Sequence, residues 1–596
     1  MTYQAPVEDI LAALKCVADL PALAAEGMYE GLDEETIKAI VEEAGKFGSD
    51  ILDPLNRPGD QQGSKLVDGG VVTPDGWKEA YAQFCAGGWS SLPAPEAYGG
   101  QALPEIVATM ACEIWNATNL SFGLAPLLTQ GAIAALDARG SDELKQVYLP
   151  KMVSGAWTGT MNLTEPQAGS DLAAVQTRAV PQDDGSYRIT GTKIFITYGD
   201  HDLTENIVHM VLARLPDAPP GTRGISLFLV PKFLVNGDGT LGARNDVVTA
   251  SVEHKLGIHG SPTCILKYGE KDGAVGYLVG EENRGLAVMF IMMNAARLGV
   301  GVQGVALADR ALQRARAYAQ ERTQGRGPSG KAGEMSPIIA HADIRRTLLT
   351  MHAMTQAART ICLATALELD RAEQAPSKEA REMAGARAAL LTPVAKAFST
   401  DIGCEVSSMG LQIHGGMGFI EETGAAQYFR DARILPIYEG TNGIQAIDLV
   451  TRKLPLADGQ VVGAFIDELR ASAEEIAASN RPEFGLMGQR LGEAVAALEE
   501  ATGYLRQQLE TNPEAALAGA TSYLRLFGLA AGGVYLGRQA LASVREGVPP
   551  ATSRAVALGR FFAETIAVGA GGHAQGIVTG ADALLSVPAE QVAAWS

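Results

Sequence analysis

The spacing of apolar residues changes along the chain, and these changes predict where one domain ends and the next begins. From residue 7 to about 155, apolar positions recur with a helical period. Two polar stretches rich in Gly and Pro, residues 56–70 and 93–104, interrupt this period, and we expect irregular structure there. Residues 156–284 instead contain short β-branched runs bounded by Gly, Asp and Pro, which is typical of a small β-domain. Within it, residues 225–230 are nearly all apolar, as in a strand covered on both faces.

A helical period then returns and continues to the end of the chain. Three long helices are expected at 286–321, 338–372 and 384–413. The tail beyond residue 454 contains a one-sided stripe typical of a core-facing helix: Leu491, Val495, Leu498, Thr502, Leu505 and Leu509. The predicted fold is therefore mainly α with a central β-domain. The predicted domains are 1–155 (helical), 156–284 (β), 285–455 (helical) and 456–596 (an appended helical bundle).

Composition excludes several classes of protein. A length of 596 residues requires several domains, and the net charge of −20 argues against a nucleic-acid-binding surface. Six scattered cysteines without a CxxC pair indicate reduced thiols in the cytoplasm and neither a disulfide framework nor a zinc site. The first residues lack the pattern of an export signal. The most apolar run, 285–308, is interrupted by Asn294, Arg297 and Gln303, which favours a buried helix over a membrane span.

One carboxylate stands out by its surroundings. Glu439 lies between the apolar run 434–438 and Gly440. An apolar setting raises the pKa of a carboxylate and makes it a stronger base, and the glycine allows close approach of a ligand. Thr441 and Asn442 resemble the N-cap of a following helix. Taken alone, the same stretch also fits a loop glutamate that precedes a helix.

Four other segments carry groups suited to a phosphate or a planar ligand. They are LTEPQAGSD at 163–171, KIFIT at 193–197, RTQGR at 322–326 and QIHGGMG at 412–418. The first presents hydroxyl and backbone N–H groups, and the second is a strand that places Phe195 and Thr197 on one face. A capped turn and ordinary helix ends are the alternatives for the first, third and fourth segments.

The pattern G-x-G-x-x-G at 299–304 has a different explanation. It lies inside a helical run with no strand before it, so it lacks the context of a dinucleotide-binding site. We expect these glycines to let two helices approach closely.

Together these segments resemble the acyl-CoA dehydrogenase family. TEPQAGSD, KIFIT, QIHGGMG, FRDARI and YEGTNGIQ occur in the order and spacing of that family, over about residues 35–455. The resemblance implies a helical N-domain, a β-barrel-like middle domain and a four-helix C-domain that hold FAD in a homodimer or higher homo-oligomer. The polar stretch 56–70 and the helical tail are similar to a longer bacterial branch, which includes an enzyme that acts on 3-(methylthio)propanoyl-CoA.

The resemblance also assigns residues. It implies Glu439 as the catalytic base, and Ser170, Asn294, Arg297 and Gly440 as contacts of the acyl-CoA. The implied cofactor contacts are Leu163, Thr164, Ser170, Phe195 and Thr197, then Arg322, Gln324, Gln412, Gly415 and Gly416 toward the FAD of the partner subunit, and Thr441, Asn442 and Gly443. Phe195 stands where many members have Trp, and Asn294 where many have Asp. The expected helix at 286–321 carries no carboxylate near Arg297, so Glu439 has no rival there.

The implied reaction is α,β-dehydrogenation of an acyl-CoA to a trans-2-enoyl-CoA. The Glu439 backbone N–H would stabilise the developing enolate, and electrons would pass to an electron-transfer flavoprotein. A general short- or medium-chain acyl-CoA dehydrogenase, an acyl-CoA oxidase and a non-catalytic or nucleic-acid-associated relative of the fold are the alternatives.

Overall fold

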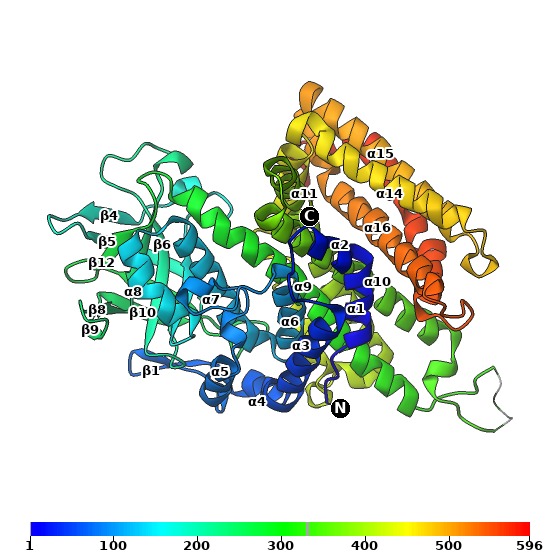
Figure 1. Ribbon diagram of the computed structural model, residues 1–596, viewed down its shortest axis with the longest axis horizontal. Coiled ribbons are helices and arrows are strands. Elements are labelled where there is room, and N and C mark those ends of the chain that lie inside the picture. Colours follow the sequence, from blue (N-terminus) through cyan, green and yellow to red (C-terminus); the bar gives the residue numbers. More distant parts are fainter. Residues whose placement is uncertain (1, 329, 331–332, 596) are drawn as a thin grey trace.

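The structure is a computed structural model, which describes residues 2–328, 330 and 333–595. The β-domain lies at one side, and the long helix α9 (Gly285–Glu321) runs from it into a helical mass that contains α10 (Ala342–Gln374) and α11 (Lys378–His414), with the C-terminal helices packed on the far side (Figure 1). The fold is thus mainly helical with a central β-domain and extra C-terminal helices, as predicted.

The N-terminal region is helical and contains one small hairpin. Its elements are α1 (Val7–Val17), α2 (Leu20–Ala25), α3 (Glu34–Phe47), α4 (Asp53–Gln62), β1 (Lys65–Val67), β2 (Gly70–Val72), α5 (Trp77–Ala86), α6 (Glu105–Thr118), α7 (Leu120–Arg139) and α8 (Asp142–Val153). The prediction of irregular structure over 56–70 was wrong, because α4 covers its first half and the hairpin its second. The prediction relied on Pro and Gly residues as signs of irregular structure. However, α4 contains Pro58 in its interior and ends before Gly63, whose φ is 65°.

The β-domain is built on a sheet in the order β10-β11-β5-β12-β7-β6-β3, with β4 beside β5. Its strands are β3 (Trp157–Asn162), β4 (Arg178–Pro181), β5 (Tyr187–Thr197), β6 (Asn206–Ala213), β7 (Ser226–Pro231), β10 (Val247–Val252), β11 (Thr263–Tyr268) and β12 (Ala274–Leu278), with a separate hairpin of β8 (Phe233–Val235) and β9 (Leu241–Arg244). Every residue of β7 is buried, as its apolar sequence predicted. An apolar layer between this sheet and α7, α8 and α9 fixes the sheet against the helices.

Three long helices form the centre of the molecule. They are α9 (Gly285–Glu321), α10 (Ala342–Gln374) and α11 (Lys378–His414), followed by the short α12 (Ala425–Ala432) and α13 (Asn442–Asp448). The glycines of the G-x-G-x-x-G pattern lie inside α9. A Cβ on Gly301 would approach the backbone oxygen of Ala395 to 2.5 Å, and one on Gly304 that of Ser399 to 2.2 Å. These glycines therefore allow α9 and α11 to touch, as predicted.

The C-terminal helices share the main core with the central helices. They are α14 (Gln460–Ala478), α15 (Met487–Thr511), α16 (Pro513–Arg545), α17 (Arg554–Phe561), α18 (Ala570–Leu585) and α19 (Ala589–Ala594). The predicted stripe on α15 is buried, with only Leu509 partly exposed. Gly528 of α16 lies against the ring of Phe398 on α11, and Gly532 against Ala357 on α10.

Two helices are long and apolar enough to cross a membrane by length and composition. In α7 and α9, respectively, 78% and 61% of the apolar window is buried inside the protein. Burial of this kind is typical of core helices, which pass the same test of length and composition.

Candidate active site

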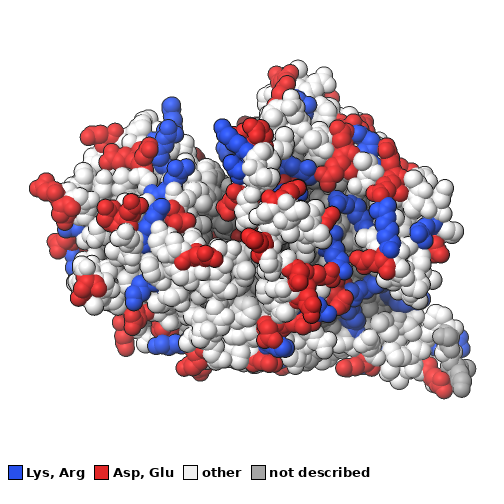
Figure 2. Space-filling model, viewed as in Figure 1, with Lys and Arg blue, Asp and Glu red and all other residues white. Residues whose placement is uncertain are grey.

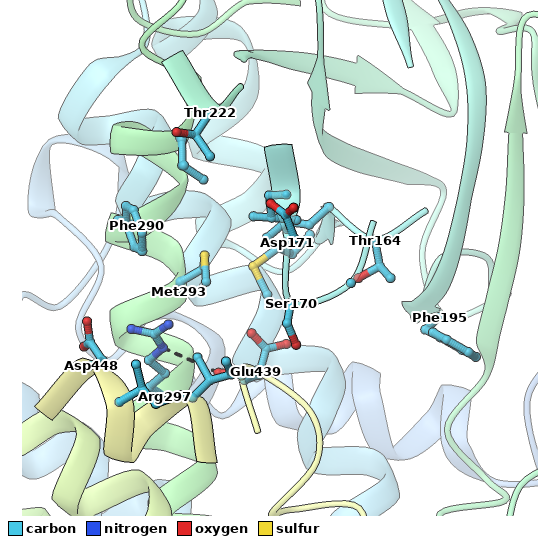
Figure 3. A pocket seen from close by; sticks show the side chains of 18 of the residues that line it. Thr164, Ser170, Asp171, Phe195, Thr222, Phe290, Met293, Arg297, Glu439 and Asp448 are labelled. Carbon is cyan, nitrogen blue, oxygen red and sulfur yellow. Dashed lines mark hydrogen bonds between the residues drawn. The ribbon is translucent and has the colours of Figure 1, made fainter. Parts of the chain in front are cut away.

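A pocket of about 420 Å³ lies where the β-domain meets α9 and the loop that precedes α13. Figure 3 shows side chains converging on it from three directions: α9, the loop after β3, and the segment that carries Glu439. Of the predicted site residues, the pocket brings together Leu163, Thr164, Ser170, Phe195, Thr197, Arg297, Glu439 and Gly440. Residues more than 250 positions apart in sequence therefore meet at one site.

A tight backbone turn presents Glu439. After α12 ends at Ala432 the chain turns, and both Glu439 and Gly440 have positive φ, 56° and 86°. A non-glycine residue rarely adopts this conformation, so the surrounding structure must hold it. The Asn442 N–H donates to the Pro436 carbonyl at 2.9 Å and closes the turn. Thr441 then caps α13 by accepting from the Ile444 N–H, as predicted.

Burial and two cations set the charge state of Glu439. Burial raises the pKa of Glu439 to about 7, while Arg297 and Lys396 oppose this rise. Both cations are buried, Arg297 on α9 and Lys396 on α11. A carboxyl group with a pKa near neutrality is well suited to act as a base, because it is ionised at working pH yet binds a proton strongly.

Side chains from three helices bind the carbonyl groups of this turn. Arg297 Nε donates to the Glu439 carbonyl at 3.4 Å, and Lys396 Nζ to the Gly440 carbonyl at 2.9 Å. Gln445 Nε2 donates to both, at 3.3 and 3.4 Å. The hydrogen bonds among the described residues include none from the Glu439 N–H. This donor is available to a ligand oxygen.

The loop after β3 is fixed by a buried ion pair. Lys193 Nζ donates to the Leu163 carbonyl at 3.0 Å and to Glu165 at 2.8 Å. Glu165 also accepts from the Thr177 hydroxyl and from the N–H groups of Gln176 and Thr177. Burial alone would raise the pKa of Glu165, but the Lys193 ammonium and these donors outweigh it and lower that pKa. The backbone of 163–165 is thereby held against β5, and Thr164 accepts from the Ile194 N–H at 2.9 Å.

Phe195 projects from an irregularity in β5. The pairing of β5 with β11 shifts register between Lys193 and Ile196, and Phe195 has φ of 59°. Such a bulge re-aims a side chain. The Phe195 ring is left 59% exposed, with Thr164 and Thr197 lining the same pocket. Figure 3 shows Phe195 and Thr164 on the side of the pocket away from Arg297. An open aromatic surface flanked by hydroxyls fits a planar ring with polar edges, so these residues suit the flavin of FAD.

The remaining predicted residues do not line this pocket. Arg322 and Gln324 follow the C-terminal end of α9, while Gln412, Gly415 and Gly416 lie where α11 ends. Thr441, Asn442 and Gly443 are outside the lining as well. The Asn442 amide donates to Ala397, Thr400 and Asp401 of α11, so its side chain is held inside the protein.

Asn294 does not line the pocket that contains the other predicted substrate contacts. It lines a second cavity, of about 640 Å³, between α7 and the opposite face of α9, together with Gly123 and Leu127. Asn294 lies about 60° around α9 from Arg297, at the edge of the pocket-lining face and on the side of Ile291 and Ala295, which line the second cavity. Asn294 and Arg297 therefore line different cavities, and the contact of Asn294 with the acyl-CoA stays a prediction.

Sequence reasoning missed several lining residues. Leu286, Phe290 and Met293 precede Arg297 on one face of α9, and Ile444, Ile447, Asp448, Thr451 and Arg452 line the pocket from α13 and the turn after it. The spacing of 4, 3 and 4 from Leu286 to Arg297 is a signal that could have found the first group. In Figure 2 a hollow separates the β-domain from the helices, with Lys and Arg side chains on both rims.

Comparison with known proteins agrees with the geometry. Four family models match consecutive parts of the chain: acyl-CoA dehydrogenase N-terminal domain (34–156), middle domain (160–269) and C-terminal domain (283–454), then acetyl-CoA dehydrogenase C-terminal like (464–588). The 3-methylmercaptopropionyl-CoA dehydrogenase of Ruegeria pomeroyi is 50% identical, over 92% of this chain and 92% of that protein. A butyryl-CoA dehydrogenase of Syntrophomonas wolfei is 35% identical, over 91% and 90%.

Solved structures share the fold. The crystal structure of an acyl-CoA dehydrogenase complexed with FAD from Bacillus anthracis has a TM-score of 0.75 at 22% identity, covering 94% of this chain and 91% of that chain. Because the likeness extends through the C-terminal helices, these helices belong to the shared architecture. The chain therefore belongs to the acyl-CoA dehydrogenase family, a family of FAD-dependent oxidoreductases that act on acyl-CoA thioesters.

Proposed function

We propose that Glu439 is the base of this enzyme and that 3-(methylthio)propanoyl-CoA is its substrate. The role of Glu439 as base is supported by its position: its carboxyl group lies in a pocket beside buried cations from two helices, and burial raises its pKa to about 7. An α-proton of a thioester is weakly acidic, so its removal requires a positioned base and stabilisation of the enolate oxygen.

The residues around Glu439 divide the remaining tasks. The Glu439 N–H, which has no acceptor among the described residues, donates to the thioester oxygen as negative charge develops there. Arg297 and Ser170 contact the CoA chain within the pocket, and Arg452 at its rim provides a cation for a CoA phosphate. Leu163, Thr164, Phe195 and Thr197 hold the flavin. FAD, when bound, accepts the β-hydrogen of the substrate as hydride.

The cofactor contacts outside the pocket are assigned to a neighbouring subunit. Arg322, Gln324, Gln412, Gly415 and Gly416 reach the FAD of the partner in a homodimer or higher homo-oligomer, and Thr441, Asn442 and Gly443 lie near the adenine half. Support for a second subunit comes from the exposed apolar side chains beside Gly416: Met417 is 50% exposed, Phe419 90% and Ile420 44%. Apolar surface of this extent is typical of an interface.

The choice of substrate is supported by the 50% identical relative, whose name specifies 3-methylmercaptopropionyl-CoA. A short- or medium-chain acyl-CoA is the second candidate, supported by the butyryl-CoA dehydrogenase at 35% identity. Anaerobic bleaching of the flavin absorbance with a panel of acyl-CoAs tests the choice. We expect 3-(methylthio)propanoyl-CoA to bleach fastest. Much slower bleaching than with butanoyl- or octanoyl-CoA would refute this substrate and leave the class unchanged.

The electron acceptor is proposed to be an electron-transfer flavoprotein in the cytoplasm. An acyl-CoA oxidase would use the same base and cofactor but reoxidise with oxygen. Under air, we expect one equivalent of substrate to reduce an artificial acceptor with little hydrogen peroxide formed. Stoichiometric peroxide in the absence of an acceptor would identify an oxidase.

A further inference from the structure

Lys396 is a buried ammonium group to which the proposed mechanism assigns no contact with the substrate or the cofactor. It lies on α11 with no exposed surface, facing the turn that carries Glu439. Its Nζ donates to the Gly440 carbonyl and to Asn442 Oδ1, both at 2.9 Å. A buried ammonium is costly unless it is paired, so its retention beside a functional turn calls for an explanation.

The contacts of Lys396 belong to a clamp between α11 and this turn. Asn442 binds Lys396 through its Oδ1 atom and donates its amide to the Ala397 carbonyl at 3.1 Å, Thr400 Oγ1 at 3.0 Å and Asp401 Oδ1 at 2.7 Å. The carbonyl oxygen of Gly440 and the side chain of Asn442 are thus both tied to one turn of α11. These hydrogen bonds involve Gly440, the second of the two residues with positive φ, and Asn442, two positions later.

Charged groups from three elements face Glu439 and Lys396. Arg297 comes from α9, Lys396 and Asp401 from α11, and Asp448 from α13, where it acts mainly on Arg297. Burial lowers the pKa of Lys396 to about 7, and the nearby Glu439 is the strongest influence in the opposite direction. Each of these two groups favours the charged form of the other.

We propose that Lys396 is a positioning residue, which fixes the peptide after Glu439 in its turn and supplies a positive charge from α11 that favours the Glu439 carboxylate. The proposal rests on the proposed function of Glu439 as the base. Lys396 touches neither substrate nor cofactor, and it acts through the orientation and the ionisation of Glu439.

Three variants of the FAD-loaded enzyme test the proposal. Lys396→Met removes the charge and the donor, while Lys396→Arg keeps a cation at the same place. Lys232→Met is the matched control, because it removes a mostly buried ammonium paired with Asp200 at 2.6 Å in the β-domain, outside the pocket. Three quantities are measured. The first is the pH midpoint of the fall of kcat on the acid side. The second is the pH midpoint of the infrared carboxyl band that disappears in Glu439→Gln, and the third is hydrogen exchange over residues 439–443.

In Lys396→Met we expect the pH midpoints of kcat and of the infrared carboxyl band to rise by about one pH unit, as for loss of a nearby opposite charge. Exchange over 439–443 should become at least about tenfold faster, as for loss of one hydrogen bond to a charged group. Lys396→Arg and Lys232→Met should keep the wild-type midpoints.

Unchanged midpoints and exchange in Lys396→Met would overturn the proposal, as would equal changes in Lys232→Met. If Lys396→Met does not fold, Lys396→Arg decides, since a displaced midpoint in that enzyme would refute the role of the charge. Full activity of Glu439→Gln would refute the role of Glu439 as base instead, while exchange over 439–443 would still report on the Lys396 contacts.

Discussion

The pKa of Glu439 depends on residues that lie far from it in the sequence. Its apolar neighbours 434–438 were expected to raise its pKa, yet Ile437 is 47% exposed. Burial raises this pKa, and the charges that oppose the rise belong to Arg297 and Lys396, 142 and 43 positions earlier in the chain. The chemistry at this residue is therefore set by tertiary packing.

Glu439→Gln removes the base and keeps the shape of the side chain. We expect turnover to fall about 10³-fold, within the range for loss of a general base, with FAD still bound. Steady-state assays and the flavin absorbance of the purified variant check this. Glu422→Gln changes an exposed acid in the 3-10 helical turn before α12; it is the control and should retain full turnover. Near-normal rates in Glu439→Gln would remove Glu439 from this role.

The pH dependence of the reaction follows from the same residue. The base must be ionised, and burial raises the pKa of Glu439 to about 7. The fraction of carboxylate falls as the pH drops through this value, so kcat/KM should decrease about tenfold per pH unit on the acid side and level off above it. A pH profile with a non-ionising substrate measures this. A fall of kcat/KM centred near the ordinary pKa of glutamate would contradict the burial of the Glu439 carboxyl group.

At the scale of elements, the closeness of α9 and α11 decides the geometry of the pocket. Arg297 is on α9 and Lys396 on α11, and both bind the same turn. Gly301 and Gly304 bring the helices near enough for this, because no side chain stands between the backbones.

Gly304→Ala should force these helices apart. A Cβ at this position would lie 2.2 Å from the Ser399 carbonyl oxygen, and backbone cannot yield as a side chain can. We expect a loss of about 3 kcal/mol in the free energy of unfolding, as for an overpacked core. Gly492→Ala on α15 is the control, since it meets open space and should stabilise the helix by about 1 kcal/mol. Denaturant unfolding of both variants measures the difference. Equal stability of the two would contradict the close contact.

At the scale of the whole molecule, the exposed apolar patch of Met417, Phe419 and Ile420 lies where α11 ends. It adjoins Gly415 and Gly416, which we assign to the FAD of a second subunit. Assembly and cofactor binding would then be linked, because one interface serves both.

Phe419→Asp places a charge in this patch and should dissociate the oligomer into monomers that lose FAD. Sedimentation velocity and the flavin content of the purified protein measure the two effects. Leu584→Asp is the control, because this residue is also exposed, at 59%, but lies on α18. A stable FAD-loaded assembly in Phe419→Asp would place the interface elsewhere.

Local patterns in the sequence determined a large part of this structure. Periodicity located the long helices and the central β-domain, since burial of one face imposes its repeat on the residues. The cap at Thr441 and the close approach at Gly304 also followed from local residue types. The helix and hairpin at 56–70 did not, because Pro and Gly indicate breaks without excluding α4 around Pro58.

The tertiary structure decided what the sequence left open. It separated Asn294 from Arg297, turned the Asn442 side chain into α11, aimed Phe195 outward through a bulge, and added Lys396 to the surroundings of Glu439. Each of these depends on which face of an element meets another element far away in the chain. Local sequence fixes the period and the ends of elements, whereas the contacts that tune a carboxylate arise only when distant segments are packed together.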